Sequence, residues 1–159
     1  MKLLTITIPS YNSESYMRKC IESLLPGGED VEILVVDDGS GDRTGEIADE
    51  YERLYPGIVR AIHQENGGHG AAVNTGLAHA TGLYFKVVDS DDWVKESAYL
   101  KILQTLRELA GGSTVLDMLV SNFVYEKEGA KKNKVMKYHH ALPQDTIFTW
   151  DEVRHFHKG

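Results

Sequence analysis

The stretch VEILVVDDGSGD, residues 31–42, joins an apolar run to two adjacent carboxylates and a loop that contains glycine. A short, continuous apolar run such as residues 33–36 is typical of a strand buried on both faces of a parallel sheet. Ligands of open α/β sheets bind outside the carboxyl ends of the strands, so Asp37 and Asp38 are predicted to lie at a ligand-binding edge. A loop that caps the following helix is the alternative. We expect one polar residue of the loop to cap, but two adjacent carboxylates exceed what capping needs.

Strand and helix patterns alternate along the chain. Apolar runs predict strands at residues 3–8, 31–36, 58–62, 83–88 and 118–125. Helices are predicted after Asn12 or Ser13 up to Leu25, and then at residues 44–55, 69–80 and 95–109, with apolar side chains repeating at i, i+3 and i+4 in most of them. Strands separated by such helices form right-handed βαβ units. The predicted class is therefore α/β with a mostly parallel central sheet.

A second acidic cluster follows the apolar run of residues 83–88. Asp89, Asp91 and Asp92 stand within four residues of one another. Carboxylates this close repel one another and are expensive to desolvate, so a cation is expected to neutralise them. Oxygen ligands suit Mg²⁺ or Mn²⁺, which would in turn bind substrate phosphates. Taken alone, the cluster leaves open a second interpretation, an acidic turn in which Asp92 caps the next helix.

Four motifs come in one order along the chain. They are residues 7–12 (TIPSYN), 35–40 (VVDDGS), 66–77 (NGGHGAAVNTGL) and 89–93 (DSDDW). Together they resemble the nucleotide-sugar-binding half of the family 2 glycosyltransferases, which are inverting enzymes with the GT-A fold. The resemblance covers residues 1–125 and implies a Rossmann-like, three-layer α/β/α arrangement. Residues 126–159 would then begin an acceptor-side region, predicted to be incomplete.

The resemblance also implies roles for individual residues. The nucleotide-sugar would be bound by Pro9, Tyr11, Asn12, Asp37, Asp38, Asn66, Gly68, His69, Asp89 and Ser90. Asp91 matches the direct metal ligand, and Asp89 is placed near the ribose or the metal. Glycines before a helix let backbone N–H groups approach an anionic ligand. Many relatives carry Arg where this chain has Val73, so a phosphate contact there is not implied. Tyr11 as a core side chain and His69 as a surface or capping side chain remain the alternatives.

The implied reaction is metal-dependent, inverting transfer of a hexose-like sugar from a nucleotide-diphosphate donor, a UDP-sugar, to an acceptor hydroxyl. Mg²⁺ or Mn²⁺ is the implied cofactor, and the acceptor is an unknown glycan, lipid-linked molecule or protein, as in polysaccharide or glycoconjugate synthesis. No residue matches the catalytic base, because Asp151 is explained more simply by a helix start. A non-catalytic nucleotide-sugar-binding module or fragment therefore stays open as the second hypothesis.

Composition limits the other classes. The chain has 159 residues, of which 42% are hydrophobic, and a net charge of −7, which argues against a nucleic-acid binder. No apolar run approaches the roughly 20 residues of a membrane span. The single Cys20 suits a reduced, cytoplasmic setting, the inner face of the membrane included, and a core thiol. Whether the chain forms a homo-oligomer is left open.

The tail differs from the rest of the chain. Residues 126–137 are polar and lack an apolar period, which predicts a loop or hairpin. Four histidines follow, at 139, 140, 155 and 157. No cysteine accompanies them, and the i, i+2 spacing of the last two places them on opposite helix faces, so we predict no structural zinc site.

Overall fold

The computed structural model describes residues 1–126, 129 and 133–153. It forms two compact units, Met1–Val115 and Leu116–Gly159. The boundary between them lies earlier in the chain than the one predicted after residue 125. No helix among the described residues is long and apolar enough to cross a membrane.

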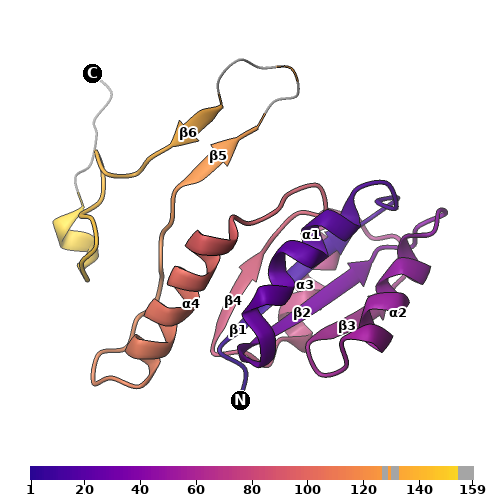
Figure 1. Cartoon of the computed structure of the whole chain (residues 1–159), viewed down its shortest axis with the longest axis horizontal. Coiled ribbons are helices and arrows are strands. Elements are labelled where there is room, and N and C mark those ends of the chain that lie inside the picture. Colours follow the sequence, from indigo (N-terminus) through magenta and orange to yellow (C-terminus); the bar gives the residue numbers. More distant parts are fainter. Residues whose placement is uncertain (127–128, 130–132, 154–159) are drawn as a thin grey trace. The chain divides into compact units, whose positions relative to one another are not determined.

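The first unit is built around a parallel sheet of four strands in the order β3-β2-β1-β4 (Figure 1). The strands are β1 (Leu4–Ser10), β2 (Val31–Asp37), β3 (Val59–His63) and β4 (Tyr84–Val87). Every residue of β1 and β2 is buried, as expected for central strands covered on both faces. These four strands and the α/β class confirm the sequence-based prediction.

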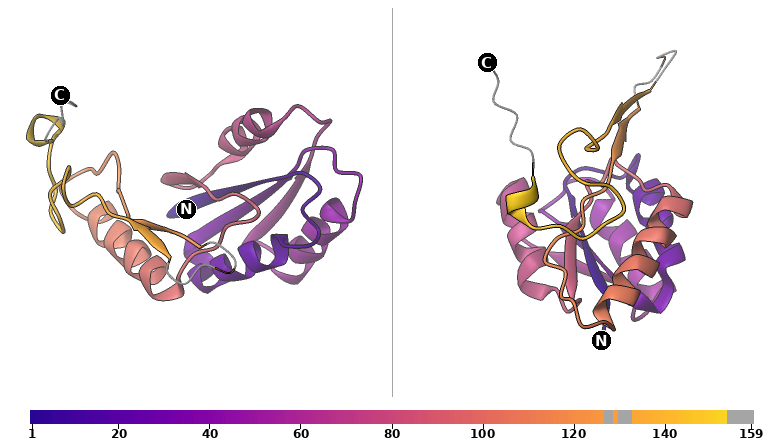
Figure 2. Two further views of the ribbon diagram at one scale, coloured as in Figure 1. Left: turned by 90° about the horizontal axis from the view of Figure 1, so that it is seen from above. Right: turned by 90° about the vertical axis from the view of Figure 1, so that its left-hand side faces the viewer.

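Helices cover both faces of this sheet. Helix α3 (His69–His79) lies on one face, and α1 (Met17–Leu24), α2 (Thr44–Leu54) and α4 (Glu96–Ala110) lie on the other (Figure 2, left). A short 3₁₀ segment, η1 (Leu25–Asp30), joins α1 to β2. The predicted three-layer arrangement is confirmed. The core includes the buried side chains Ile6, Ile8, Met17, Cys20, Ile21, Leu24, Ile33, Val35, Ile47, Val59 and Leu103.

Two helix caps considered from the sequence, by Asn12 or Ser13 and by Asp92, are not found. Helix α1 begins at Met17 after an N-cap at Tyr16, because the carbonyl oxygen of Ser13 already accepts hydrogen bonds from the amides of Tyr16 and Met17 in a turn. Helix α4 begins at Glu96 with Lys95 as N-cap and no capping side chain. Asp92 therefore does not cap the helix that follows it.

The predicted cap of the helix after β2 is not found, because the N-cap of α2 is Arg43, which has no capping side-chain hydrogen bond. Asp42, the residue before it, supports the helix start instead. Asp42 Oδ1 accepts a hydrogen bond of 2.9 Å from the backbone amide of Thr44, the first residue of α2. Asp42 Oδ2 accepts another of 3.1 Å from the amide of Glu14. Burial acts to raise the pKa of Asp42, but hydrogen bonds with the Thr44 side chain and with the backbone amides outweigh it and lower the pKa. Because Asp42 supports the start of α2, neither Asp37 nor Asp38 is needed for that role.

The second unit contains a hairpin of β5 (Phe123–Tyr125) and β6 (Lys134–Met136), paired antiparallel. The predicted hairpin is confirmed, but the prediction of a further strand in the parallel sheet at residues 118–125 is wrong. Only three residues of that run form a strand, and they pair with the nearby β6. Closing a short loop costs less entropy than closing a long connection. A 3₁₀ turn, η2 (Trp150–Glu152), follows, and its capping box with Thr149 confirms a helical start at Asp151.

Candidate nucleotide-sugar site

A cavity of about 510 Å³ opens within the first unit, at the carboxyl ends of the strands. It is lined by residues from four separate segments: Pro9, Ser10, Tyr11, Ser13, Tyr16, Asp38, Asn66, Gly68, His69, Ala72, Asp89, Ser90 and Asp91. The parallel strands β1, β2 and β4 end at one edge of the sheet, so the loops that follow them converge there. The cavity gathers most of the residues that the sequence predicted; Asn12 and Asp37 are not among its lining residues.

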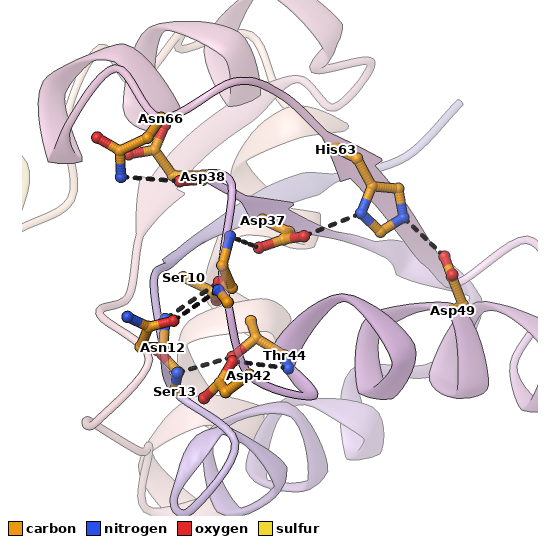
Figure 3. Close-up of polar contacts among 12 residues, drawn as sticks. Ser10, Asn12, Ser13, Asp37, Asp38, Asp42, Thr44, Asp49, His63 and Asn66 are labelled. Carbon is orange, nitrogen blue, oxygen red and sulfur yellow. Dashed lines mark hydrogen bonds and ion pairs between the residues drawn. The ribbon is translucent and has the colours of Figure 1, made fainter.

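Asn12 holds the loop after β1 against the loop after β2. Its side-chain oxygen accepts a hydrogen bond of 2.9 Å from the amide of Gly41, and its own amide donates to Ser40 Oγ at 3.0 Å. The next amide, that of Ser13, donates to Thr44 Oγ1 at 2.7 Å (Figure 3). Asn12 has a positive φ of 48°, a conformation that asparagine tolerates. Its side chain is thus used in shaping the loop beside Tyr11.

Asp38 is almost completely buried, with 2% of its surface exposed. Its Oδ1 accepts hydrogen bonds from Gln64 Nε2 at 2.6 Å and from the amide of Gly67 at 2.9 Å. Its Oδ2 accepts one from the amide of Gly68 at 2.8 Å. Burial acts to raise the pKa of Asp38, but these hydrogen bonds outweigh it and lower the pKa. A carboxylate has about four acceptor positions, so one on Oδ2 remains for a ligand.

The loop before α3 is tied to the same aspartate. Asn66 Nδ2 donates to the backbone oxygen of Asp38 at 3.0 Å (Figure 3), and Gln64 Oε1 accepts a hydrogen bond from Thr75 Oγ1 of α3 at 2.5 Å. Gly39, with φ 69°, packs so closely on this loop that a Cβ would lie 2.8 Å from the backbone nitrogen of Asn66. Gly39 therefore lets the two loops meet, and Asp38 fixes how they meet.

The carboxylates of the acidic cluster after β4 accept fewer hydrogen bonds from protein groups than Asp38 does. Asp89 Oδ1 lies 2.8 Å from His69 Nε2, at the start of α3. Asp91 is exposed in the cavity, and no side-chain hydrogen bond or ion pair of Asp91 occurs within the part of the chain that the structure describes. Burial and the negative charges of Asp91 and Asp89 raise the pKa of Asp92. The electrostatics of this loop therefore favour a bound cation.

Ser90 and Cys20 hold this acidic loop in place through hydrogen bonds. Ser90 Oγ lies 2.9 Å from Ser13 Oγ, which joins the loops after β4 and β1. Cys20 is fully buried in α1, and its thiol donates to the backbone oxygen of Asp89 at 3.5 Å. Burial, with a smaller contribution from the nearby aspartates, raises its pKa to about 12, so Cys20 is a core thiol and not a nucleophile.

A histidine that sequence reasoning missed stands behind the loop after β2. His63 Nδ1 lies 3.1 Å from Asp37 Oδ2, and His63 Nε2 lies 2.8 Å from Asp49 Oδ1 of α2 (Figure 3). Asp37 and His63 are register partners in the parallel pair β2·β3. The signal in the sequence was a polar residue at the end of each of two neighbouring strands. Asp37 thus turns its carboxylate towards β3 and α2.

The acidic side chains fit a metal that completes its coordination from a substrate. The described residues contain no group of three or more His, Cys, Asp or Glu side chains placed to enclose a metal ion. Mg²⁺ is commonly held by one or two carboxylates together with substrate phosphates and waters. Asp91, with Asp89 two residues away, matches that donor set.

The histidines of the tail lie in the second unit. The imidazole centroids of His139 and His140 are 3.7 Å apart. His155 and His157, the other members of the zinc set considered from the sequence, fall outside the described residues.

Comparison with known proteins gives a consistent result. The family model described as Glycosyl transferase family 2 matches residues 5–155. The glycosyltransferase GlyA of Streptococcus pneumoniae is 42% identical over 115 residues, which cover 69% of this chain and 16% of GlyA. GlyG of the same organism is 40% identical over 109 residues, covering 67% and 36% of the two chains.

Solved structures show the same likeness. S. aureus TarS 1-349, crystallised in complex with UDP-GlcNAc, superposes with a TM-score of 0.60 at 27% identity, over 77% of this chain and 39% of TarS 1-349. The chain thus spans from about a sixth to about two fifths of the length of these relatives.

Proposed function

Because the chain belongs to glycosyl transferase family 2, we propose that it binds a nucleotide-diphosphate sugar, a UDP-sugar, and transfers the sugar to an acceptor hydroxyl with inversion. The single observation that carries the proposal is the convergence of Asp38, His69 and the Asp89–Asp91 loop on one cavity at the carboxyl edge of the sheet. The volume of this cavity, about 510 Å³, is in the range of small-molecule sites.

We assign the nucleotide to the side of the cavity formed by the loop after β1. Tyr11 is 53% exposed, and we assign its ring as the face on which a base stacks. The remaining acceptor position of Asp38 Oδ2 would take an N–H of the base or a hydroxyl of the ribose. That TarS was crystallised with UDP-GlcNAc supports uracil as the base. Asn12 and Asp37 would contribute through the shape of the loops and not by direct contact.

We assign the diphosphate to the side formed by His69 and the loop after β4. Asp91, helped by Asp89, would hold Mg²⁺ or Mn²⁺. When bound, such an ion neutralises the charge that develops on the diphosphate leaving group. Gly68, with φ 88°, and His69 begin α3, where backbone amides and the helix dipole favour anionic oxygens. If Asp89 turns to the metal, its contact with His69 is broken. The imidazole of His69 can then donate a hydrogen bond to a phosphate oxygen instead.

The reaction is a displacement at the anomeric carbon. The acceptor oxygen forms its bond to that carbon from the face opposite the diphosphate, the bond between the carbon and the diphosphate oxygen breaks, and the nucleoside diphosphate leaves. The acceptor proton passes to a general base that this chain's assigned residues do not include. We propose the Leu116–Gly159 unit as part of the acceptor side, for a glycan, lipid-linked or protein acceptor in polysaccharide or glycoconjugate synthesis.

Calorimetric titration of UDP, with and without Mn²⁺, tests the donor site. The chain is expected to bind UDP more tightly with Mn²⁺, and Asp91→Asn should remove that gain, a loss of at least about tenfold. Asp117→Asn, at an exposed position outside the cavity, is the matched control and should leave binding unchanged. Equal affinity for wild type and Asp91→Asn in Mn²⁺ would contradict the metal assignment.

Release of UDP from UDP-sugars separates an enzyme from a non-catalytic binding module. Metal-dependent UDP binding with no release, across glucose, galactose and N-acetylated donors offered with glycan acceptors, would favour the binding module. Release that depends on Asp91 would establish the transferase.

A further inference from the structure

His63 joins three elements through its two ring nitrogens. It ends β3 and contacts Asp37 of β2 through Nδ1 and Asp49 of α2 through Nε2, at 3.1 and 2.8 Å (Figure 3). Carboxylate oxygens only accept hydrogen bonds, so both contacts can be hydrogen bonds only when both ring nitrogens carry a hydrogen. The hydrogen bonds to these two carboxylates raise the pKa of His63, while burial opposes them. The geometry therefore stabilises the imidazolium.

The backbone of α2 packs closely against this ion pair. A Cβ added at Gly45, in the first turn of α2, would lie 2.8 Å from Asp37 Oδ2 and 3.4 Å from His63 Nδ1. Glycine within a helix lowers its stability, so a helix former would be expected at an unconstrained position. At Gly45 the close approach of the helix backbone to the pair explains the residue.

Asp37 connects His63 to the wall of the cavity through hydrogen bonds. Its second oxygen, Oδ1, accepts a hydrogen bond of 3.0 Å from the amide of Ser40. Ser40 Oγ in turn accepts one of 3.0 Å from the amide of Asn12, which directly follows Tyr11 in the cavity wall. A continuous series of contacts thus leads from Asp49 to the wall that carries Tyr11, and each member fixes the next.

We propose that His63, as an imidazolium, is a positioning residue of the cavity: it holds Asp37 in place, and Asp37 holds the loops that set Tyr11. His63 does not line the cavity and touches no ligand. Loss of its proton leaves one ring lone pair facing a carboxylate, so the ring can no longer donate to Asp37 and Asp49 together and its hold on Asp37 weakens. The cavity wall therefore loosens as the pH rises through the pKa of His63. The inference depends on the proposed function only for the identity of the ligand.

Among the described residues, the charged groups that face His63 are two carboxylates. Asp37 approaches it from β2 and Asp49 from α2, and both favour the protonated ring. Asp49 is largely exposed and lies outside the cavity, which makes Asp49→Asn a way to change the titration of His63 without touching the ligand. Glu52→Gln, at an exposed position of the same helix, is the matched control.

Nuclear magnetic resonance of the ligand-free chain tests the coupling directly. The ring signals of His63 should titrate above the ordinary histidine value, and the amide signals of Ser40, Asn12 and Tyr11 should shift with the same midpoint. Asp49→Asn should lower all of these midpoints together, and Glu52→Gln should change none of them. Amide signals that do not follow the His63 ring, or a ring that titrates at its ordinary value, would overturn the proposal.

Affinity for UDP in Mn²⁺ gives the functional readout. We take the Kd of His63→Gln divided by the Kd of wild type, because titration of UDP itself cancels in this ratio. Near pH 6 the ratio is expected to be about five to ten, a typical effect of a residue acting through a contact network. The ratio should fall to about one when the pH exceeds the pKa of His63. When both proteins also carry Asp49→Asn, the ratio should reach about one at a lower pH.

The outcomes separate this inference from the proposed function. A ratio above one that does not change with pH would show a purely structural role and overturn the proposal. If neither protein binds UDP, the proposed function fails, and the ligand-free titration still decides whether His63 positions the loop.

Discussion

The acidic cluster after β2 and the acidic cluster after β4 differ in how far protein groups already satisfy them. Asp38 accepts hydrogen bonds from Gln64 and from the amides of Gly67 and Gly68, and Asp37 is held by Ser40 and His63. Asp91, in contrast, is exposed in the cavity without a side-chain partner among the described residues. The first pair therefore holds loops together, whereas Asp91 keeps a carboxylate that no side chain of the described residues binds.

The largest effect expected from this difference concerns stability. Asp38→Ala would leave the amides of Gly67 and Gly68 without their acceptor in a buried place, at a cost of about 3 kcal/mol in the free energy of unfolding. Asp91→Ala removes no protein contact and should change stability by less than about 0.5 kcal/mol. Urea denaturation of both variants checks the contrast. Similar losses at the two positions would remove the distinction between the clusters.

The second prediction concerns pH and sharpens the role of the first cluster. The folded-state pKa of His63 lies above its unfolded value of about 6.5, so its contribution is fully present below pH 6.5 and is lost as the pH rises through the folded pKa. Wild type should exceed His63→Gln by no more than about 1 kcal/mol at low pH, because solvent screens a half-exposed imidazole. The unfolding free energies of wild type and His63→Gln should therefore converge as the pH rises. A difference between the two proteins that grows with pH would contradict the prediction.

The smallest expected effect lies in the second cluster. Asp92→Asn relieves repulsion from Asp89 and Asp91 and should raise stability by about 0.5 kcal/mol in metal-free buffer. The gain should shrink when Mn²⁺ and UDP are both present, because a bound cation already offsets that repulsion. Thermal unfolding in the two buffers measures both values. A destabilised Asp92→Asn would mean that the carboxylate has a structural role.

Much of this arrangement followed from the sequence because it depends on local patterns. The apolar run at residues 33–36 predicted a central strand, and the acidic residues that end it indicated the edge of the sheet at which the cavity lies. The same reasoning failed where distant partners decide the outcome. Nothing local to His63 shows that its ring reaches Asp49 on α2, because that contact depends on how the helix packs across Gly45. The expected strand at residues 118–125 failed since β6 offered a nearer partner than β4.

The roles within the first cluster also required coordinates. Asp37 ends β2 and Asp38 begins the loop that follows, and the sequence did not say which of the two carboxylates lies in the cavity wall. The structure turns Asp38 to the loop before α3 and Asp37 to His63. The second cluster was easier to interpret because repulsion among close carboxylates is visible in the sequence itself.

The central claim is that Asp91 and the cavity around it bind a metal together with a nucleoside diphosphate. Anomalous diffraction at the manganese edge, from crystals grown with UDP and Mn²⁺, tests it most directly. The account predicts one manganese peak that bridges the Asp91 carboxylate and the diphosphate, with the uracil against Tyr11 and Asp38. A peak beside His139 and His140, or UDP bound with no manganese near Asp91, would contradict it.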